Sequence, residues 1–298
     1  MDCHWRFLGP PQGTAVLLLH GFGASSGHWR HTAPGLAAKG FRVHALDLIG
    51  FGASEQPRWT AACALDNRLW ARQVTAFLSE VVGSPTILVG NSLGGLTALT
   101  AAVLGPQHVL AVAAAPLPDP ALVQAVPARR PPRGRRLQRR LVRLIMRLLP
   151  LELIIPLIAR TPLLSRGLQG AYKHSVHRDK ELLQLIARPA RRPTAARALR
   201  AMSIGMALRP RGATAPALLE RLQGRIPMLL IWGRQDRFVP LSVGRSAAQQ
   251  FPWLQLEVID NCGHCPHDET PAAFIEKLQT WLDHNLMTAR PAGPGPRR

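Results

Sequence analysis

Several residue types are scarce in this chain of 298 residues. It has 17 acidic residues against 37 basic ones, only four cysteines, and a single tyrosine. The cysteines form no even framework of the kind that stabilises small secreted domains, and the first residues lack the features of a secretory leader, so we expect a reducing compartment. No stretch reaches about 18 uninterrupted apolar residues, which argues against a membrane span. The shortage of acidic and tyrosine side chains disfavours a site for cationic substrates.

Hydrophobic residues make up 47% of the chain, which is ample for the core of one large domain. Apolar β-branched runs alternate with helical patterns, and this alternation predicts βαβ crossovers and a mostly parallel sheet. We expect strands at 15–19, 42–46, 86–90, 109–114, 227–232 and 255–260, and helices around 30–39, 66–82, 94–104 and 271–285. The fold class is therefore α/β.

Residues 117–225 interrupt this rhythm, because they are helical, rich in arginine and proline, and without a credible strand. We therefore predict a core in two parts, 1–116 and 226–286, a helical cap at 117–225 and a disordered tail at 287–298. About thirteen residues precede Thr14, which leaves room for one short strand before the first parallel strand. Either the sheet is trimmed at this edge or the start of the protein lies further upstream.

A serine enclosed by glycines follows the strand at 86–90, in the pattern Gly90-x-Ser92-x-Gly94. Such spacing lets a strand turn sharply into a helix, with the serine in a strained backbone conformation that exposes its hydroxyl. Ser92 is therefore the candidate nucleophile. The Leu93 N–H at the start of the helix and an N–H from the glycine-flanked loop at Phe22 are placed to stabilise an oxyanion.

Two carboxylates and two histidines compete as partners of Ser92. Asp236 follows the strand at 227–232, and Asp119 follows an earlier strand. His264 comes shortly after the strand at 255–260, and His267 lies three residues further on. The cluster Cys262, His264, Cys265 and His267 is spaced too tightly for a four-ligand zinc site in one loop, so we expect no metal and no cofactor.

The chain resembles the α/β-hydrolase superfamily. The matching motifs are His20-Gly21-Phe22-Gly23, Asp47-Leu48-Ile49-Gly50-Phe51-Gly52-x-Ser54, Gly90-Asn91-Ser92-Leu93-Gly94-Gly95, Gly233-Arg234-Gln235-Asp236 and Gly263-His264. This resemblance implies the α/β-hydrolase fold with an inserted cap, a Ser92–Asp236–His264 triad, and an oxyanion hole formed by Phe22 and Leu93. It also implies a structural role for Asp47 and a loop-shaping role for His20.

A narrower resemblance, carried by the serine motif and by residues 116–120 and 187–190, is to the cyanobacterial and plastid branch that includes pheophytinase and chlorophyll dephytylase. It implies hydrolysis of a lipophilic carboxylic ester, such as the phytyl ester of chlorophyll pigments, through an acyl-enzyme. Two alternatives stay open: a lipase or acylglycerol hydrolase of ordinary acyl chains, and a non-catalytic scaffold that binds lipid or a partner protein.

The formal net charge of +20 is unevenly distributed. No acidic residue lies between Pro120 and Leu151, whereas apolar and basic residues repeat there at helical spacing. The basic positions are Arg136, Arg139, Arg140, Arg143 and Arg147, and the apolar ones are Leu137, Leu141, Leu144, Ile145 and Leu148. This helix suits an anionic membrane surface, although a cap helix that packs its leucines on the core has the same pattern.

The remaining expectations concern partners and location. No nucleic-acid-binding fold accompanies the charge, so we expect no nucleic-acid partner. We expect a cytoplasmic enzyme that is peripheral at an intracellular membrane of the thylakoid type.

Overall fold

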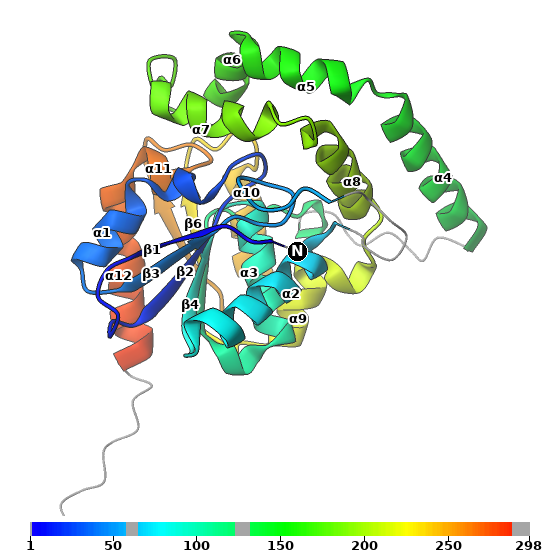
Figure 1. Ribbon diagram of the computed structural model, residues 1–298. Coiled ribbons are helices and arrows are strands. Elements are labelled where there is room, and N and C mark those ends of the chain that lie inside the picture. The colour runs from blue at the N-terminus through cyan, green and yellow to red at the C-terminus, as the bar shows by residue number, and fades with distance from the viewer. Residues whose placement is uncertain (1, 58–64, 123–131, 288–298) are drawn as a thin grey trace, which may run out of the picture.

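A computed structural model describes residues 2–57, 65–122 and 132–287, and it contains one seven-stranded sheet (Figure 1). The strand order is β1-β3-β2-β4-β5-β6-β7, with only β1 antiparallel to its neighbour. The strands are β1 (Trp5–Leu8), β2 (Ala15–Leu19), β3 (Arg42–Leu46), β4 (Thr86–Gly90), β5 (Val109–Ala114), β6 (Met228–Gly233) and β7 (Gln255–Ile259). The predicted α/β fold with a mostly parallel sheet is therefore confirmed, and one short strand precedes β2.

Helices cover both faces of this sheet, as apolar central strands require. On one face lie α1 (Thr32–Ala38) and α12 (Pro271–Met287), which enclose a core cluster that includes Trp29, Leu36 and Phe274. On the other face lie α2 (Asn67–Phe77), α3 (Leu93–Leu104), α9 (Ala215–Leu222) and α10 (Leu241–Gln250). Strands β2, β4 and β6 are buried along their whole length, so the middle of the sheet forms the centre of the core.

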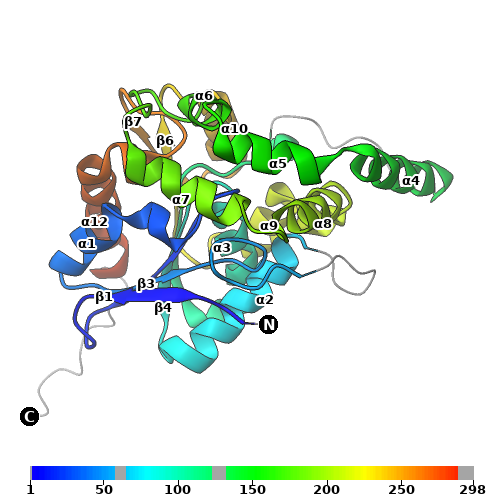
Figure 2. The ribbon, with the colours of Figure 1, turned by 45° about the horizontal axis from the view of Figure 1, so that its top comes forward.

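The expected cap is helical in its described part and lies across the carboxyl ends of the strands (Figures 1 and 2). It contains α4 (Pro132–Leu148), α5 (Leu151–Arg160), α6 (Leu163–Gln169), α7 (Lys180–Ala190) and α8 (Ala195–Ala207). Pro156 and Pro189 lie inside α5 and α7. Because α9 packs on α3 in the main core cluster, the last helix of the expected cap segment contacts the core directly.

Some local predictions differ from the structure. The helix expected at 30–39 is confirmed as α1, but the 3₁₀ turn that precedes it, Ser26–Trp29, was not predicted, and the end of the helix expected at 66–82 is a π-helical turn, Leu78–Val82. Helices α10 and α11 (Pro266–Glu269) were not predicted. Residues 123–131 of the expected cap and 288–298 of the expected tail lie outside the described residues. In the described part of the chain, every helix is too short or too polar to cross a bilayer.

Candidate active site

Ser92 lies where β4 turns into α3, with backbone angles φ 53° and ψ −113°. Few residues with side chains adopt such a positive φ, and the conformation is typical of a nucleophile at a strand-to-helix turn. The turn needs its glycines: a Cβ on Gly90 would lie 2.3 Å from the Gly94 carbonyl carbon, and a Cβ on Gly94 would lie 2.1 Å from the Leu19 carbonyl oxygen. The glycine spacing therefore permits the sharp turn, and Ser92 is left partly exposed.

Asp236 and His264 form a hydrogen-bonded pair beside the carboxyl ends of β6 and β7. The His264 Nδ1 lies 2.8 Å from an Asp236 carboxylate oxygen, and both residues are largely buried. The other carboxylate oxygen accepts hydrogen bonds from the backbone N–H groups of Phe238, at 2.8 Å, and Val239, at 2.9 Å. These bonds fix the carboxylate, which in turn holds the proton on Nδ1 and leaves Nε2 of His264 as the basic nitrogen.

Asn91 connects the serine turn to the histidine loop. Its side-chain amide donates to the carbonyl of His264 at 3.1 Å and to the carbonyl of Ala115 at 2.5 Å. The Ser92 N–H donates to the same Ala115 carbonyl at 3.3 Å. Asn91, which immediately precedes the predicted nucleophile, therefore connects the end of β4, the end of β5 and the loop that carries His264.

The loop after β2 is shaped by His20. This buried histidine donates from Nδ1 to the Gly21 carbonyl at 2.8 Å and accepts at Nε2 from the Leu48 N–H at 3.0 Å, and burial lowers its pKa. Both nitrogens of the neutral ring are thus used for structure. Within the described residues, neither the Phe22 N–H nor the Leu93 N–H is used in a hydrogen bond, so both predicted oxyanion donors are available.

Asp47 holds the neighbouring turn. Its buried carboxylate accepts from the backbone N–H groups of Ser26, at 2.5 Å, and Ala53, at 2.8 Å, and it lies 3.0 Å from the ring of His4. These bonds agree with the structural role that the sequence indicated.

The two rival residues lie in other networks. The Asp119 carboxylate accepts from the Ala215 N–H at 2.7 Å and from Arg209 at 3.1 Å, so it holds the start of α9. His267 is fully buried, lies 3.3 Å from the ring of His28, and has no bond to either carboxylate. The geometry thus brings Asp236 and His264 together and keeps Asp119 and His267 apart from them.

Sequence reasoning missed three residues around His264. The Ala171 carbonyl accepts the His264 N–H at 2.7 Å, and the Glu269 carboxylate accepts the Gly263 N–H at 2.6 Å. Glu269 also accepts the backbone N–H of His174 at 2.6 Å, so it joins the histidine loop to the segment after α6. The Phe238 ring lies 5.5 Å from the His264 ring and is 57% exposed. No motif marks these residues, and apart from the bond between Glu269 and Gly263 their contacts join segments far apart in the sequence.

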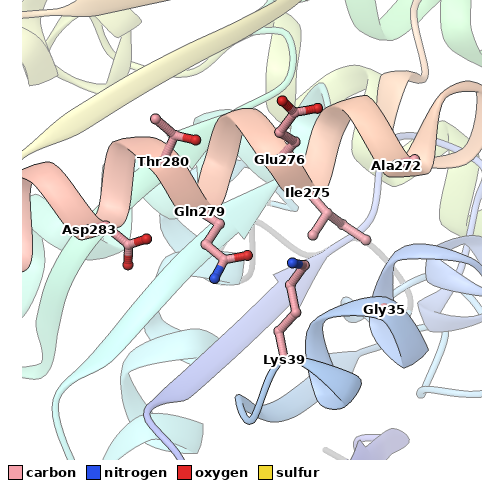
Figure 3. Close-up of a pocket in the computed structure, with 8 residues that line it drawn as sticks. All are labelled: Gly35, Lys39, Ala272, Ile275, Glu276, Gln279, Thr280 and Asp283. Carbon is pink, nitrogen blue, oxygen red and sulfur yellow. The ribbon is translucent and has the colours of Figure 1, made fainter.

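A groove between α1 and α12 lies apart from these residues (Figure 3). Its lining includes Gly35 of α1, Lys39 directly after α1, and Glu276 and Gln279 of α12, and the Lys39 side chain extends towards α12. None of the predicted site residues lines it, so we assign it no part in the chemistry.

Comparison with known proteins decides the family. The model of the "Alpha/beta hydrolase family" matches residues 16–277, which is most of the chain. The chain belongs to the alpha/beta hydrolase family. At this coarse level the molecule is a hydrolase, and the resemblance inferred from its motifs is confirmed.

Two relatives of this hydrolase and one solved structure with the same fold illustrate the similarity. Chloroplastic pheophytinase from Arabidopsis thaliana is 27% identical over 307 residues, which cover 91% of this chain and 61% of the relative. A pimeloyl-[acyl-carrier protein] methyl ester esterase from Vibrio parahaemolyticus is 28% identical over 276 residues, covering 90% and 94% of the two chains. The solved structure of a thermophilic esterase from Thermogutta terrifontis is 22% identical with a TM-score of 0.68, covering 95% and 93%.

Proposed function

We propose that this chain is a serine hydrolase that cleaves a carboxylic ester of a lipophilic substrate through an acyl-enzyme. The observation that carries this proposal is the Asp236–His264 pair, linked through Asn91 to the strained turn that bears Ser92. Similarity to two relatives named as a pheophytinase and a methyl ester esterase supports the reaction class.

The mechanism follows from the roles proposed for the two ring nitrogens of His264. As the Ser92 hydroxyl oxygen attacks the ester carbonyl carbon, Nε2 of His264 accepts the hydroxyl proton, and Asp236 stabilises the imidazolium through Nδ1. The carbonyl oxygen becomes an oxyanion, which the Phe22 and Leu93 N–H groups bind. His264 returns the proton to the leaving alcohol. A water then repeats the sequence on the acyl-enzyme, releasing the acid and restoring Ser92.

Exposed aromatic rings beside the site support an apolar substrate. Phe22 and Phe238 are each 57% exposed, although rings of this size normally bury most of their surface. Phe22 packs edge-on to Phe51 at 5.8 Å, and Phe238 lies next to His264. A long acyl or isoprenoid group would cover these rings, and this favours a lipophilic ester, for which a phytyl ester is our first candidate.

Labelling with a fluorophosphonate tests the serine mechanism. We expect one adduct on Ser92 in the folded wild-type protein and none in Ser92→Ala, with both proteins giving the same circular dichroism. Absence of an adduct from folded wild-type protein would overturn the enzyme proposal and leave the non-catalytic scaffold.

The substrate class needs a separate assay. We expect wild type to release phytol from pheophytin or chlorophyll faster than it hydrolyses a monoacylglycerol, with Ser92→Ala as the blank. A faster rate on the monoacylglycerol would instead assign the chain as a lipase of ordinary acyl chains.

A further inference from the structure

Exposed apolar side chains concentrate on three consecutive helices. Among the described residues, most large exposed hydrophobic side chains lie between residues 137 and 163, in α4, α5, the start of α6 and the turn after α4. Leu148 and Leu153 are 72% and 73% exposed. The exposed apolar residues are Leu137, Leu141, Leu144, Ile145, Leu148, Leu149, Leu153, Leu157, Ile158 and Leu163. Together with the exposed arginines of the same helices, they form what we call the apolar–basic face. The alternative in which the leucines of α4 pack on the core therefore does not describe this structure.

The charge on these helices is almost entirely positive. Arg140, Arg143, Arg147, Arg160 and Arg166 are exposed there. Glu152 is the one acidic residue between Leu137 and Arg166, and Arg200 of α8 binds it at 2.9 Å. The face therefore combines exposed leucines with arginines and no uncompensated carboxylate.

The inner side of the same helices is anchored. Arg200 of α8 donates to the carbonyls of Met146, at 2.8 Å, and Leu149, at 3.0 Å, so it holds the end of α4 against α8. Helix α4 packs on α8, and α5 packs on α7 and α8. Figure 2 shows α4 and α5 along one side of the molecule, with α4 extending beyond the sheet. The exposed leucines thus belong to helices that are held in place.

We propose that the apolar–basic face docks on an anionic lipid bilayer, with leucines between the head groups and arginines at the phosphates. A second copy of the chain fits less well, because a symmetric contact would bring the arginines of this face against their own counterparts. A nucleic acid would pair with the arginines but leave the leucines in water.

Docking would bring the site close to the lipid. Two residues after α6 ends, Ala171 binds the backbone of His264. The face and the histidine loop are therefore parts of one connected structure. This proposal does not rest on the proposed function, because binding is measured without turnover.

Flotation of the full-length Ser92→Ala protein with two kinds of vesicle tests the proposal. One kind contains phosphatidylcholine alone, and the other contains equimolar phosphatidylcholine and phosphatidylglycerol. We expect binding to the anionic vesicles only, and weaker binding in high salt. Equal binding to both vesicles, or binding to neither, would overturn the proposal, as would self-association through this face without vesicle binding.

Matched variants locate the surface. The triple change Arg140→Gln, Arg143→Gln and Arg147→Gln should weaken binding about fivefold per arginine, or about a hundredfold together. The control Arg72→Gln, Arg221→Gln and Arg245→Gln removes the same charge from other helices and should bind nearly as Ser92→Ala does. Equal losses in both triples would mean that net charge alone acts, which would contradict a specific face.

The apolar half has its own variant, Leu141→Ser, Leu144→Ser and Leu148→Ser. We expect it to lose most of the binding while keeping the circular dichroism of the parent. Made in the active wild-type background, it should also keep the parent's rate on a small water-soluble ester. Unchanged vesicle binding by this variant would contradict insertion of the leucines.

Discussion

His264 lies in the loop before α11 and His267 lies three residues further on, inside α11, and their surroundings differ in kind. His264 faces a carboxylate, with Asp236 at 2.8 Å, and has an exposed aromatic ring beside it. His267 is fully buried, packs on the ring of Trp29 with centroids 4.2 Å apart, and faces another histidine. Burial lowers the pKa of His267 well below its usual range. Proximity in sequence therefore says little about which imidazole transfers protons.

The buried histidine belongs to an ordered chain of hydrogen bonds. Nε2 of His267 lies 3.3 Å from Nδ1 of His28, and Nε2 of His28 lies 2.7 Å from the Tyr172 hydroxyl oxygen. Tyr172 donates to Asp268 at 2.8 Å, and Arg30 binds the other oxygen of that carboxylate at 2.9 Å. Because the Tyr172 hydroxyl donates to Asp268, His28 must be neutral, donating from Nε2 to that hydroxyl and accepting at Nδ1 from His267. This chain joins Tyr172, in the helical segment above the sheet, to Asp268 and Arg30, whereas the proposed function requires the His264 pair to accept a proton.

Exchanging each histidine for glutamine should separate these roles most strongly. We expect His264→Gln to lower kcat on a small ester by at least about 10³-fold while the protein stays folded, because the general base is lost. His267→Gln should change kcat less than about tenfold and lower the unfolding temperature. Steady-state kinetics and thermal unfolding of both variants test this. A larger kcat loss in His267→Gln would reverse the assignment.

The same comparison extends to the two carboxylates. Asp236→Asn should reduce kcat by about 10³- to 10⁴-fold, since the amide no longer holds the histidine tautomer. Asp119→Asn should leave kcat within about tenfold and destabilise the protein, because Asp119 binds Arg209 and the start of α9. If instead Asp119→Asn is the inactive variant, the acid has been misassigned.

Acid should weaken the fold through the buried histidine chain. Burial lowers the pKa of His28 from 6.5 to about 4, so the unfolded chain takes up a proton in this range that the folded protein excludes. The contribution of neutral His28 to the free energy of unfolding is fully present above about pH 6.5. It falls by on the order of 3 kcal/mol as the pH drops towards about 4. Urea unfolding across this range should show a smaller pH slope in His28→Gln. Parallel slopes in the two proteins would contradict this account.

The smallest effect should come from Tyr172→Phe, which removes one hydroxyl from the chain. Two buried partners, His28 and Asp268, then lose a hydrogen bond, so we expect destabilisation by about 1–3 kcal/mol. The value of kcat should fall less than it does in Asp236→Asn. Urea unfolding and steady-state kinetics measure the two effects. An unchanged free energy of unfolding would show that the hydroxyl does not stabilise the contact between the Tyr172 segment and the core.

The elements that repeat a local pattern were predictable from the sequence. The strands at 15–19, 42–46, 86–90 and 109–114 match the structure residue for residue, since each is a short and mostly apolar segment. The turn at Ser92 was predictable because its glycines permit only a few backbone paths. Helix α10 was not, because it carries few large apolar residues.

The contacts that complete the site were beyond sequence reasoning. Asn91 reaches the carbonyl of His264 across 173 positions, and Tyr172 reaches Asp268 across 96. Nothing in either neighbourhood indicates a distant partner. The leucines of α4 present the same limit, since their helical spacing is equally compatible with a buried and an exposed face.

The bond from the His264 N–H to the Ala171 carbonyl, with the Glu269 carboxylate beside it, makes the helices above the sheet and the hydrolase core one thermodynamic unit. Displacement of these helices from the core would remove the hydrogen-bond acceptor of the His264 N–H. Disorder in the loop that carries His264 would equally remove the contacts that hold the helices. Such linkage is reciprocal. A covalent inhibitor that immobilised His264 would therefore also stabilise the contact between these helices and the core, even without touching the helices.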